Sequence, residues 1–152
     1  MAFKAWSTAF DDGGAISRRH SKEAENVAPA IEWSDPPSGT RSYALLCEDP
    51  DAASGIFTHW LMWDIPGDCR AIPEGFEPGK LGVAGTNDFG EQGYGGPLPP
   101  AGHGPHRYIF KLYALDMKRI PLSPGGRRTE FERALWGHVI EETSVTGKYE
   151  RT

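Results

Sequence analysis

The sequence has no long hydrophobic run and no surplus of basic residues. None of its windows approaches the roughly 18 apolar residues that cross a membrane as a helix, and the first residues lack the apolar core of a secretory signal. The formal net charge is −5 at pH 7, so the chain has no strong positive field with which to hold nucleic acid or an anionic membrane. We therefore expect a cytoplasmic protein that has no membrane span and no nucleic-acid partner.

Cysteine is also scarce, and the usual signatures of metal and nucleophilic chemistry are missing. The two cysteines, Cys47 and Cys69, are too few for a disulfide scaffold. The chain has no HExxH or paired CxxC spacing for zinc, no GxSxG or Ser-x-x-Lys signal for a nucleophilic serine, and no glycine fingerprint of a nucleotide site. We expect no metal and no cofactor, although Asp49, His59 and His106 could supply three zinc ligands if the fold brought them together.

Glycine and proline, by contrast, are abundant and unevenly placed. Together they make up 32 of the 152 residues, which is about a fifth, against a usual share of roughly 12%. Residues 73–105 alone contain 10 glycines and 6 prolines. Such a segment cannot form a regular helix, and long loops of compact domains are commonly functional. We therefore predict a single, mostly β domain over residues 1–152, with a functional loop over 73–105.

The regular elements are predicted from apolar patterning on either side of this loop. Runs of apolar, β-branched and aromatic residues that are bounded by turn formers predict strands; these runs are residues 42–48, 58–65 and 108–115. Thr129 and Glu132 form a capping-box pattern, and apolar residues such as Phe131 and Leu135 follow at helical spacing. This pattern predicts one helix over residues 130–142.

Two polar features lie at or near the ends of the predicted strands. Asp49 and Asp51 flank a proline directly after the first run, where an ordinary Asx-Pro turn explains them unaided. A carboxylate at a strand end beside a glycine-rich loop is also a common element of binding sites. His59 lies inside an apolar run, where a packed and hydrogen-bonded core histidine is the alternative to a ligand-binding one.

Two imidazoles and a phenol mark the end of the glycine-rich loop, where the last predicted strand begins. Side chains two residues apart on a strand share a face, so His106 and Tyr108 point the same way and Arg107 points the opposite way. His106 and Tyr108 can therefore donate hydrogen bonds to one point while Arg107 braces the loop, with His103 nearby. A polar loop end without any binding role is the alternative.

Three stretches in a fixed order carry a family resemblance. They are Tyr43–Ser54 (YALLCEDPDAAS), Phe57–Pro66 (FTHWLMWDIP) and Gly85–Asp116 (GTNDFGEQGYGGPLPPAGHGPHRYIFKLYALD). A lone DPD or HRY would carry little weight, but the ordered set resembles the phosphatidylethanolamine-binding proteins, also called Raf kinase inhibitor proteins. It is most similar to their short bacterial and archaeal branch.

The resemblance implies a mostly β fold, in which a large antiparallel sheet packs on a smaller sheet with one or two peripheral helices. It also implies a small pocket at one edge that receives phosphate-like anions. By matched motif positions the ligand-binding residues are Asp49, His59, Pro100, His106 and Tyr108, with Asp51 and Gly96 close by.

From this resemblance we predict a non-catalytic protein that binds a small anion or a phosphorylated ligand, such as a phospholipid headgroup, and has a regulatory role. The implied protein partner is a kinase or a protease, and a homodimer is consistent with the short branch. The alternative is a metal-assisted or general acid/base hydrolase that uses Asp49, His59 and His106.

Overall fold

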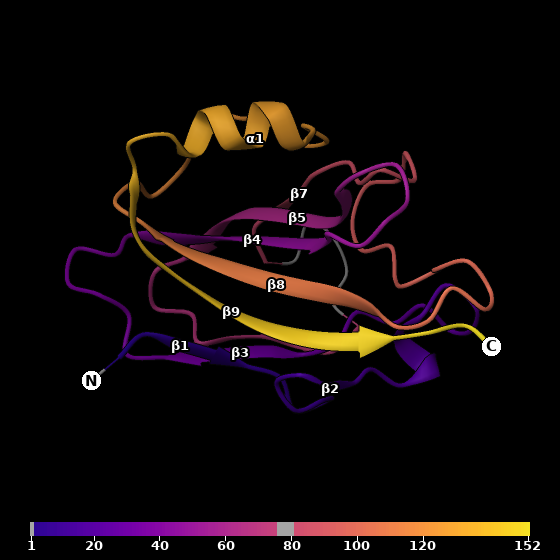
Figure 1. The fold of residues 1–152 in the computed structure, drawn as a ribbon. Helices are drawn as coiled ribbons and strands as arrows, with labels where there is room; N and C mark the ends of the chain where they lie inside the picture. The colour runs from indigo at the N-terminus through magenta and orange to yellow at the C-terminus, as the bar shows by residue number, and fades with distance from the viewer. Residues whose placement is uncertain (1, 76–80) are drawn as a thin grey trace.

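Two β-sheets of unequal size form most of the structure. The computed structural model describes residues 2–75 and 81–152. Its elements in chain order are β1 (Lys4–Trp6), β2 (Gly14–Ala15), the 3-10 helix η1 (Arg18–His20), β3 (Ile31–Ser34), β4 (Ser42–Asp49), β5 (Phe57–Pro66), β6 (Ala71–Ile72), β7 (Val83–Ala84), β8 (His106–Leu115), α1 (Arg128–Leu135) and β9 (Val139–Tyr149). The large sheet has the order β2-β9-β8-β4-β5-β7 and the small sheet the order β1-β3-β6. The fold class predicted from the sequence is therefore confirmed (Figure 1).

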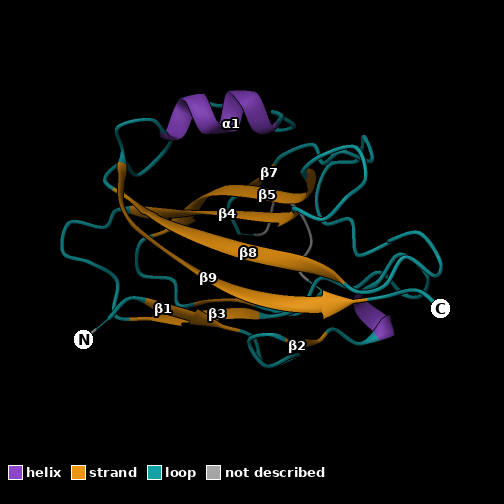
Figure 2. Ribbon diagram, viewed as in Figure 1, coloured by secondary structure: helices purple, strands orange, loops and turns teal. Residues whose placement is uncertain are grey.

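The three predicted strands are the centre of the large sheet. β4 pairs antiparallel with β5 on one side and with β8 on the other. All eight residues of β4 are buried, because the strand is covered on both faces. Tyr43 and Leu45 point into the core between the two sheets, while Ala44 and Leu46 point into a second core that includes Phe131 of α1. Figure 2 shows α1 on the face of the large sheet that is opposite the small sheet.

The predicted helix over 130–142 is wrong in its second half. The helix α1 ends at Leu135, and Gly137 adopts a φ of 79°, which is the left-handed conformation that commonly ends helices. The chain then becomes β9, which pairs antiparallel with β8 from Val139 to Tyr149. The helical spacing of the apolar residues therefore did not reveal this eleven-residue strand.

The predicted capping box is also shifted by two residues. The backbone N–H of Arg127 donates to the Glu130 carboxylate at 3.0 Å, so the helix begins before Thr129. Thr129 itself lies inside the first turn of α1. The predicted position failed because Glu130 and Glu132 both offer a carboxylate near the helix start, and the turn before Arg128 decides which one is used.

The glycine-rich segment is an ordered loop in its described part. Asn87 is fully buried and accepts hydrogen bonds from the backbone N–H groups of Phe89 and Glu91, at 2.9 and 3.2 Å. Its amide nitrogen donates to the Gly93 carbonyl at 3.0 Å. One side chain thus replaces the sheet or helix bonds that this backbone lacks, which lets the loop keep one shape beside β5.

Within residues 2–75 and 81–152, no helix has the length and apolar character needed to span a membrane.

Candidate functional site

The ends of three neighbouring strands and the glycine-rich loop meet at one edge of the large sheet. β4 ends at Asp49, which pairs with Phe57 at the start of β5. β8 begins at His106 and runs antiparallel to β4, with Glu48 opposite Ile109. This register places the first residues of β8 beside the last residue of β4. Side chains that are far apart in the sequence, Asp49 and Tyr108 among them, therefore lie together.

These residues enclose a cavity of about 220 Å³. Five of the seven residues named from the sequence line it: Asp49, His59, Pro100, His106 and Tyr108. The three polar side chains Asp49, His59 and His106 are each only 3% exposed. A buried carboxylate and two buried imidazoles are costly to desolvate unless each has partners, so their hydrogen bonds define what the cavity can do.

Asp49 and His106 form a buried pair that extends to His103. The Asp49 carboxylate accepts the Nδ1 hydrogen of His106 at 2.7 Å, and its other oxygen accepts the Asp51 backbone N–H at 2.7 Å. On the far side of the ring, His106 Nε2 lies 2.7 Å from Nδ1 of His103. Asp49 thus fixes the orientation of the His106 ring, and Nε2, the nitrogen on the other side of the ring, faces His103.

His59 is held in place by the loop. Its Nδ1 lies 2.7 Å from the Gly95 carbonyl, and the Gly95 N–H donates back to the His59 carbonyl at 2.9 Å. The ring packs among Phe57, Phe89 and Tyr108, with centroids 4.8, 5.4 and 5.2 Å away. Burial lowers the pKa of His59, an effect that outweighs the opposite influence of the Gly95 carbonyl and the nearby carboxylates. His59 is therefore neutral near pH 7 and presents Nε2 as a lone pair.

The Tyr108 hydroxyl is the one polar atom of the cavity wall that is buried without a partner. Tyr108 is 1% exposed, and its hydroxyl has no hydrogen-bond partner among the described residues. Burial raises its pKa, and so do the charge of the Asp49 carboxylate and the interaction of that carboxylate with the hydroxyl, so the hydroxyl keeps its proton at any ordinary pH. A buried O–H without an acceptor is unfavourable, which is the pattern of a group positioned for a ligand.

The other two residues named from the sequence do not line the cavity. The Asp51 carboxylate accepts hydrogen bonds from the Arg107 backbone N–H at 2.9 Å and from its guanidinium at 2.8 and 3.0 Å. This bonding lowers the pKa of Asp51 to about 2. The pair ties the turn after β4 to the start of β8, and Arg107 braces the loop end as its place on the strand predicts.

Gly96 has a packing role beside the cavity. Its N–H donates to the Asn26 side chain at 2.7 Å, and a Cβ atom there would lie 2.1 Å from the His20 carbonyl oxygen. Only glycine fits this approach of the loop to η1. Gly96 therefore fixes the path of the loop that carries the Gly95 partner of His59.

Several apolar residues of the cavity were not singled out from the sequence. Phe57, Phe89, Leu98 and Pro99 line it, together with the short segment Ala52–Ser54. The Lys22 ammonium lies 4.4 Å from the centre of the Phe89 ring and supports it from outside. Phe89 and Leu98 lie within the stretch that carries the family resemblance, but an apolar residue in a loop gives no signal of its own.

Comparisons with known proteins agree with this arrangement. The model of the family described as phosphatidylethanolamine-binding protein matches residues 6–150. The chain belongs to the phosphatidylethanolamine-binding protein family. It is 40% identical over 151 residues to a UPF0098 protein of Aquifex aeolicus, and the alignment covers 97% of this chain and 88% of that protein.

Two solved structures of the family are similar over the whole chain. A homologue from Chlamydia trachomatis is 30% identical, with a TM-score of 0.90 over 99% of both chains. Escherichia coli YbcL, described as a member of the mammalian family, is also 30% identical, with a TM-score of 0.92 over 100% of both chains. The resemblance inferred from the sequence motifs is confirmed.

The geometry does not provide the metal centre of the alternative hypothesis. Among residues 2–75 and 81–152, no three histidine, cysteine or carboxylate side chains are grouped so that they could hold a metal ion. Asp49 and His106 satisfy each other instead, and His59 is bonded to the loop.

Proposed function

We propose that this cavity binds a small phosphate-like anion or a phosphorylated small molecule, and that the protein acts by binding rather than by catalysis. The observation that carries the proposal is the buried Tyr108 hydroxyl, which has no partner and lies in the same cavity as the Asp49–His106 pair. At about 220 Å³ the cavity is smaller than the roughly 300–1,000 Å³ of typical drug-sized sites. It therefore suits a ligand of a few heavy atoms.

The cavity can accept negative charge when His106 is protonated. The imidazolium keeps its Nδ1–H on the Asp49 carboxylate, so that the pair is neutral. Its second N–H, at Nε2, is donated to a ligand that takes the place of His103. Hydrogen bonds from a charged donor are stronger than neutral ones. The Tyr108 hydroxyl donates a second bond, and the apolar wall of Phe57, Phe89 and Leu98 accommodates an organic substituent on the phosphate.

The lack of an activated nucleophile among the described residues favours binding over hydrolysis. Among residues 2–75 and 81–152, no serine, threonine or cysteine side chain is hydrogen-bonded to His59, His103 or His106. The regulatory part of the proposal, with a kinase or a protease as partner, is supported by family membership. Release of inorganic phosphate from phosphoethanolamine by the purified protein would instead support the hydrolase alternative.

The direct test is His106→Ala, studied by calorimetric titration with inorganic phosphate and with phosphoethanolamine. Loss of one charge-assisted hydrogen bond costs about 1.5–3 kcal/mol, which is a fall in affinity of roughly ten- to a hundredfold. His106 is the first residue of β8 and the partner of the buried Asp49 carboxylate, so the variant should be less stable than wild type, and a far-UV circular dichroism spectrum recorded at the titration temperature shows whether it is folded.

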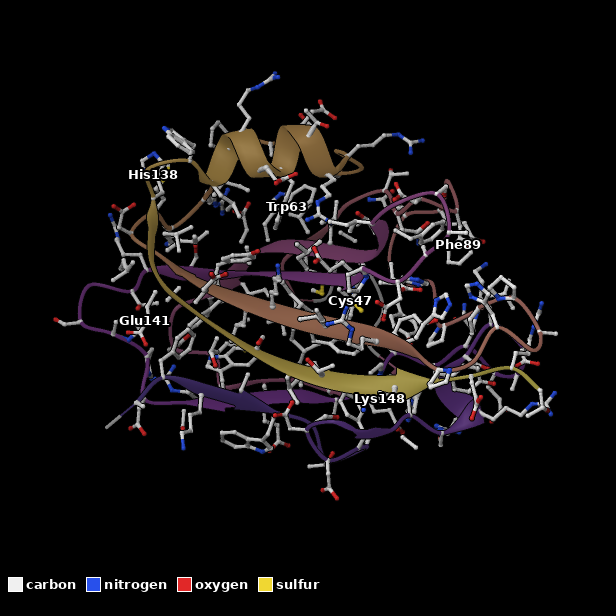
Figure 3. All side chains as sticks on the ribbon, in the orientation of Figure 1. Cys47, Trp63, Phe89, His138, Glu141 and Lys148 are labelled. Carbon is white, nitrogen blue, oxygen red and sulfur yellow. The ribbon has the colours of Figure 1, made fainter. Side chains whose placement is uncertain are left out.

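A matched control is His138→Ala. His138 also pairs with a carboxylate, that of Asp116 at 2.9 Å, but it lies half-buried in the turn between α1 and β9, away from the cavity (Figure 3). Its removal should leave phosphate affinity unchanged. Equal affinity in wild type and His106→Ala would show that the cavity is not the anion site.

A further inference from the structure

The bonded partners of the cavity's polar side chains decide which of their atoms can donate to a ligand. A carbonyl oxygen only accepts, so His59 Nδ1 carries the hydrogen that bonds to the Gly95 carbonyl. The neutral His59 ring then has a lone pair on Nε2 and no second N–H. His59 therefore offers the ligand an acceptor. The carboxylates of Asp49 and Asp88 lie near this ring, and burial outweighs their influence.

The same reasoning applies to the pair on the other side of the cavity. A carboxylate only accepts, so Nδ1 of His106 carries the hydrogen that bonds to Asp49. In a neutral His106 ring, Nε2 is an acceptor, and the hydrogen of the 2.7 Å contact belongs to His103 Nδ1. Without a bound proton, this group offers the ligand no donor, and Asp49 adds a negative charge beside it.

The cavity therefore combines acceptors with few donors. His59 Nε2 and the Asp49 carboxylate accept, and the Tyr108 hydroxyl donates. His106 donates to a ligand only when it holds a proton on Nε2 and the ligand replaces His103 there. An anion with acceptors alone would leave His59 unpaired and would face the Asp49 charge directly. An anion that also carries an O–H or N–H satisfies both kinds of group, and buried polar groups that stay unpaired are the strongest means of rejecting a near-identical ligand.

We propose that the cavity selects oxyanions that carry a hydrogen-bond donor of their own. A monoprotonated phosphate or phosphomonoester fits this description through its P–OH group, and an ammonium group near the phosphate provides the same chemistry. Sulfate and phosphodiesters without an amine do not fit. This inference rests on the proposed function, and it specifies the ligand class of that same cavity.

The first experiment compares inorganic phosphate with sulfate by calorimetric titration of the full chain, in an oxyanion-free buffer at constant ionic strength. Near pH 6 every inorganic phosphate ion carries at least one P–OH group, whereas sulfate has no proton. We expect phosphate to bind at least roughly tenfold more tightly, the effect of one lost hydrogen bond to a charged group. Equal affinities would overturn this inference and leave the proposed function standing. Binding of neither ion, nor of the organic phosphates below, would overturn both.

The source of the donor is resolved with matched organic probes. Methyl phosphate should bind and dimethyl phosphate should not, because the diester has no P–OH. Phosphoethanolamine and phosphocholine differ in whether the amine carries N–H groups. Equal affinity for these two assigns the donor to the phosphate oxygen, whereas tighter binding of phosphoethanolamine assigns it to the ammonium. Equal binding of methyl and dimethyl phosphate would overturn the inference.

Asp49→Asn provides a test in which the selectivity should change rather than the affinity alone. An amide at this position removes the negative charge beside the cavity and one of the acceptors that favour a ligand with its own donor. We therefore expect the sulfate affinity of the variant to rise and its phosphate-to-sulfate ratio to fall at least several-fold. A ratio that stays at the wild-type value in the folded variant would overturn the inference. Should this variant not fold, the wild-type comparison of phosphate and sulfate decides alone.

Discussion

At the residue scale, the cavity contains one group that the fold itself does not need. Tyr108 packs in the core between the sheets, yet its hydroxyl is buried without a partner. Leaving a buried polar group unsatisfied costs about 1–3 kcal/mol. The aromatic ring therefore stabilises the fold while the oxygen opposes it, and the two contributions can be separated by removing the oxygen alone.

Tyr108→Phe should raise the free energy of unfolding by about 1 kcal/mol and weaken phosphate binding at the same time. The ring is kept and only the unpaired hydroxyl is lost. Chemical denaturation and calorimetric titration measure the two effects. The control is Tyr94→Phe, because the Tyr94 hydroxyl donates to the His20 carbonyl at 2.7 Å and its loss should destabilise the protein. If Tyr108→Phe were less stable than wild type, the hydroxyl would have a structural partner.

At the scale of elements, the sequence predicted the strands better than the helix. Residues 43–47 form an uninterrupted apolar run, and a strand buried on both faces explains this run directly. The region after Arg128 was harder to predict because apolar residues continue at helical spacing from Phe131 to Val139 and conceal the change at Gly137. Propensity and periodicity describe a local face, whereas β9 exists because β8 offers it a long antiparallel partner.

The candidate site could likewise be predicted only in part from the sequence. The ordered motifs predicted that Asp49, His59, His106 and Tyr108 would meet, and the structure brings them into one cavity. The hydrogen-bond directions were not accessible from the sequence, because they depend on which carbonyl or carboxylate faces each imidazole nitrogen. His103 shows this most clearly, since only the folded loop brings its Nδ1 to His106.

The junction between α1 and β9 depends on the backbone of Gly137. Gly137 has a φ of 79°, and no atom lies within 4 Å of the position that an added Cβ would take. Gly137→Ala should therefore be destabilising through backbone strain alone, by about 1–2 kcal/mol. Gly137→Asn should cost clearly less, because asparagine tolerates this conformation. Urea denaturation of both variants measures the difference. Equal losses would mean that packing, rather than the left-handed turn, sets the cost.

At the scale of the whole molecule, the free energy of unfolding depends on the protonation of individual side chains. The Asp51 pKa is lowered from 3.8 to about 2, so the stabilisation from its bonds with Arg107 is present above pH 3.8 and is lost as the pH falls toward 2. Asp51→Asn should remove this part of the acid transition. The pair is largely exposed, so we expect a modest effect that salt reduces.

His59 titrates in a separate and higher pH range. Burial lowers its pKa below the ordinary value of 6.5, so the unfolded chain takes up a proton at a pH where the folded protein does not. Below pH 6.5 this difference favours the unfolded chain, and the free energy of unfolding falls as the pH decreases. Wild type should therefore lose stability as the pH falls below 6.5, and His59→Gln should lose less over the same range, even if the variant is less stable overall. Urea denaturation across this range, in buffers free of phosphate and sulfate, measures both slopes. Parallel slopes would mean that His59 is protonated in the folded protein, and that the cavity has a donor where we have placed an acceptor.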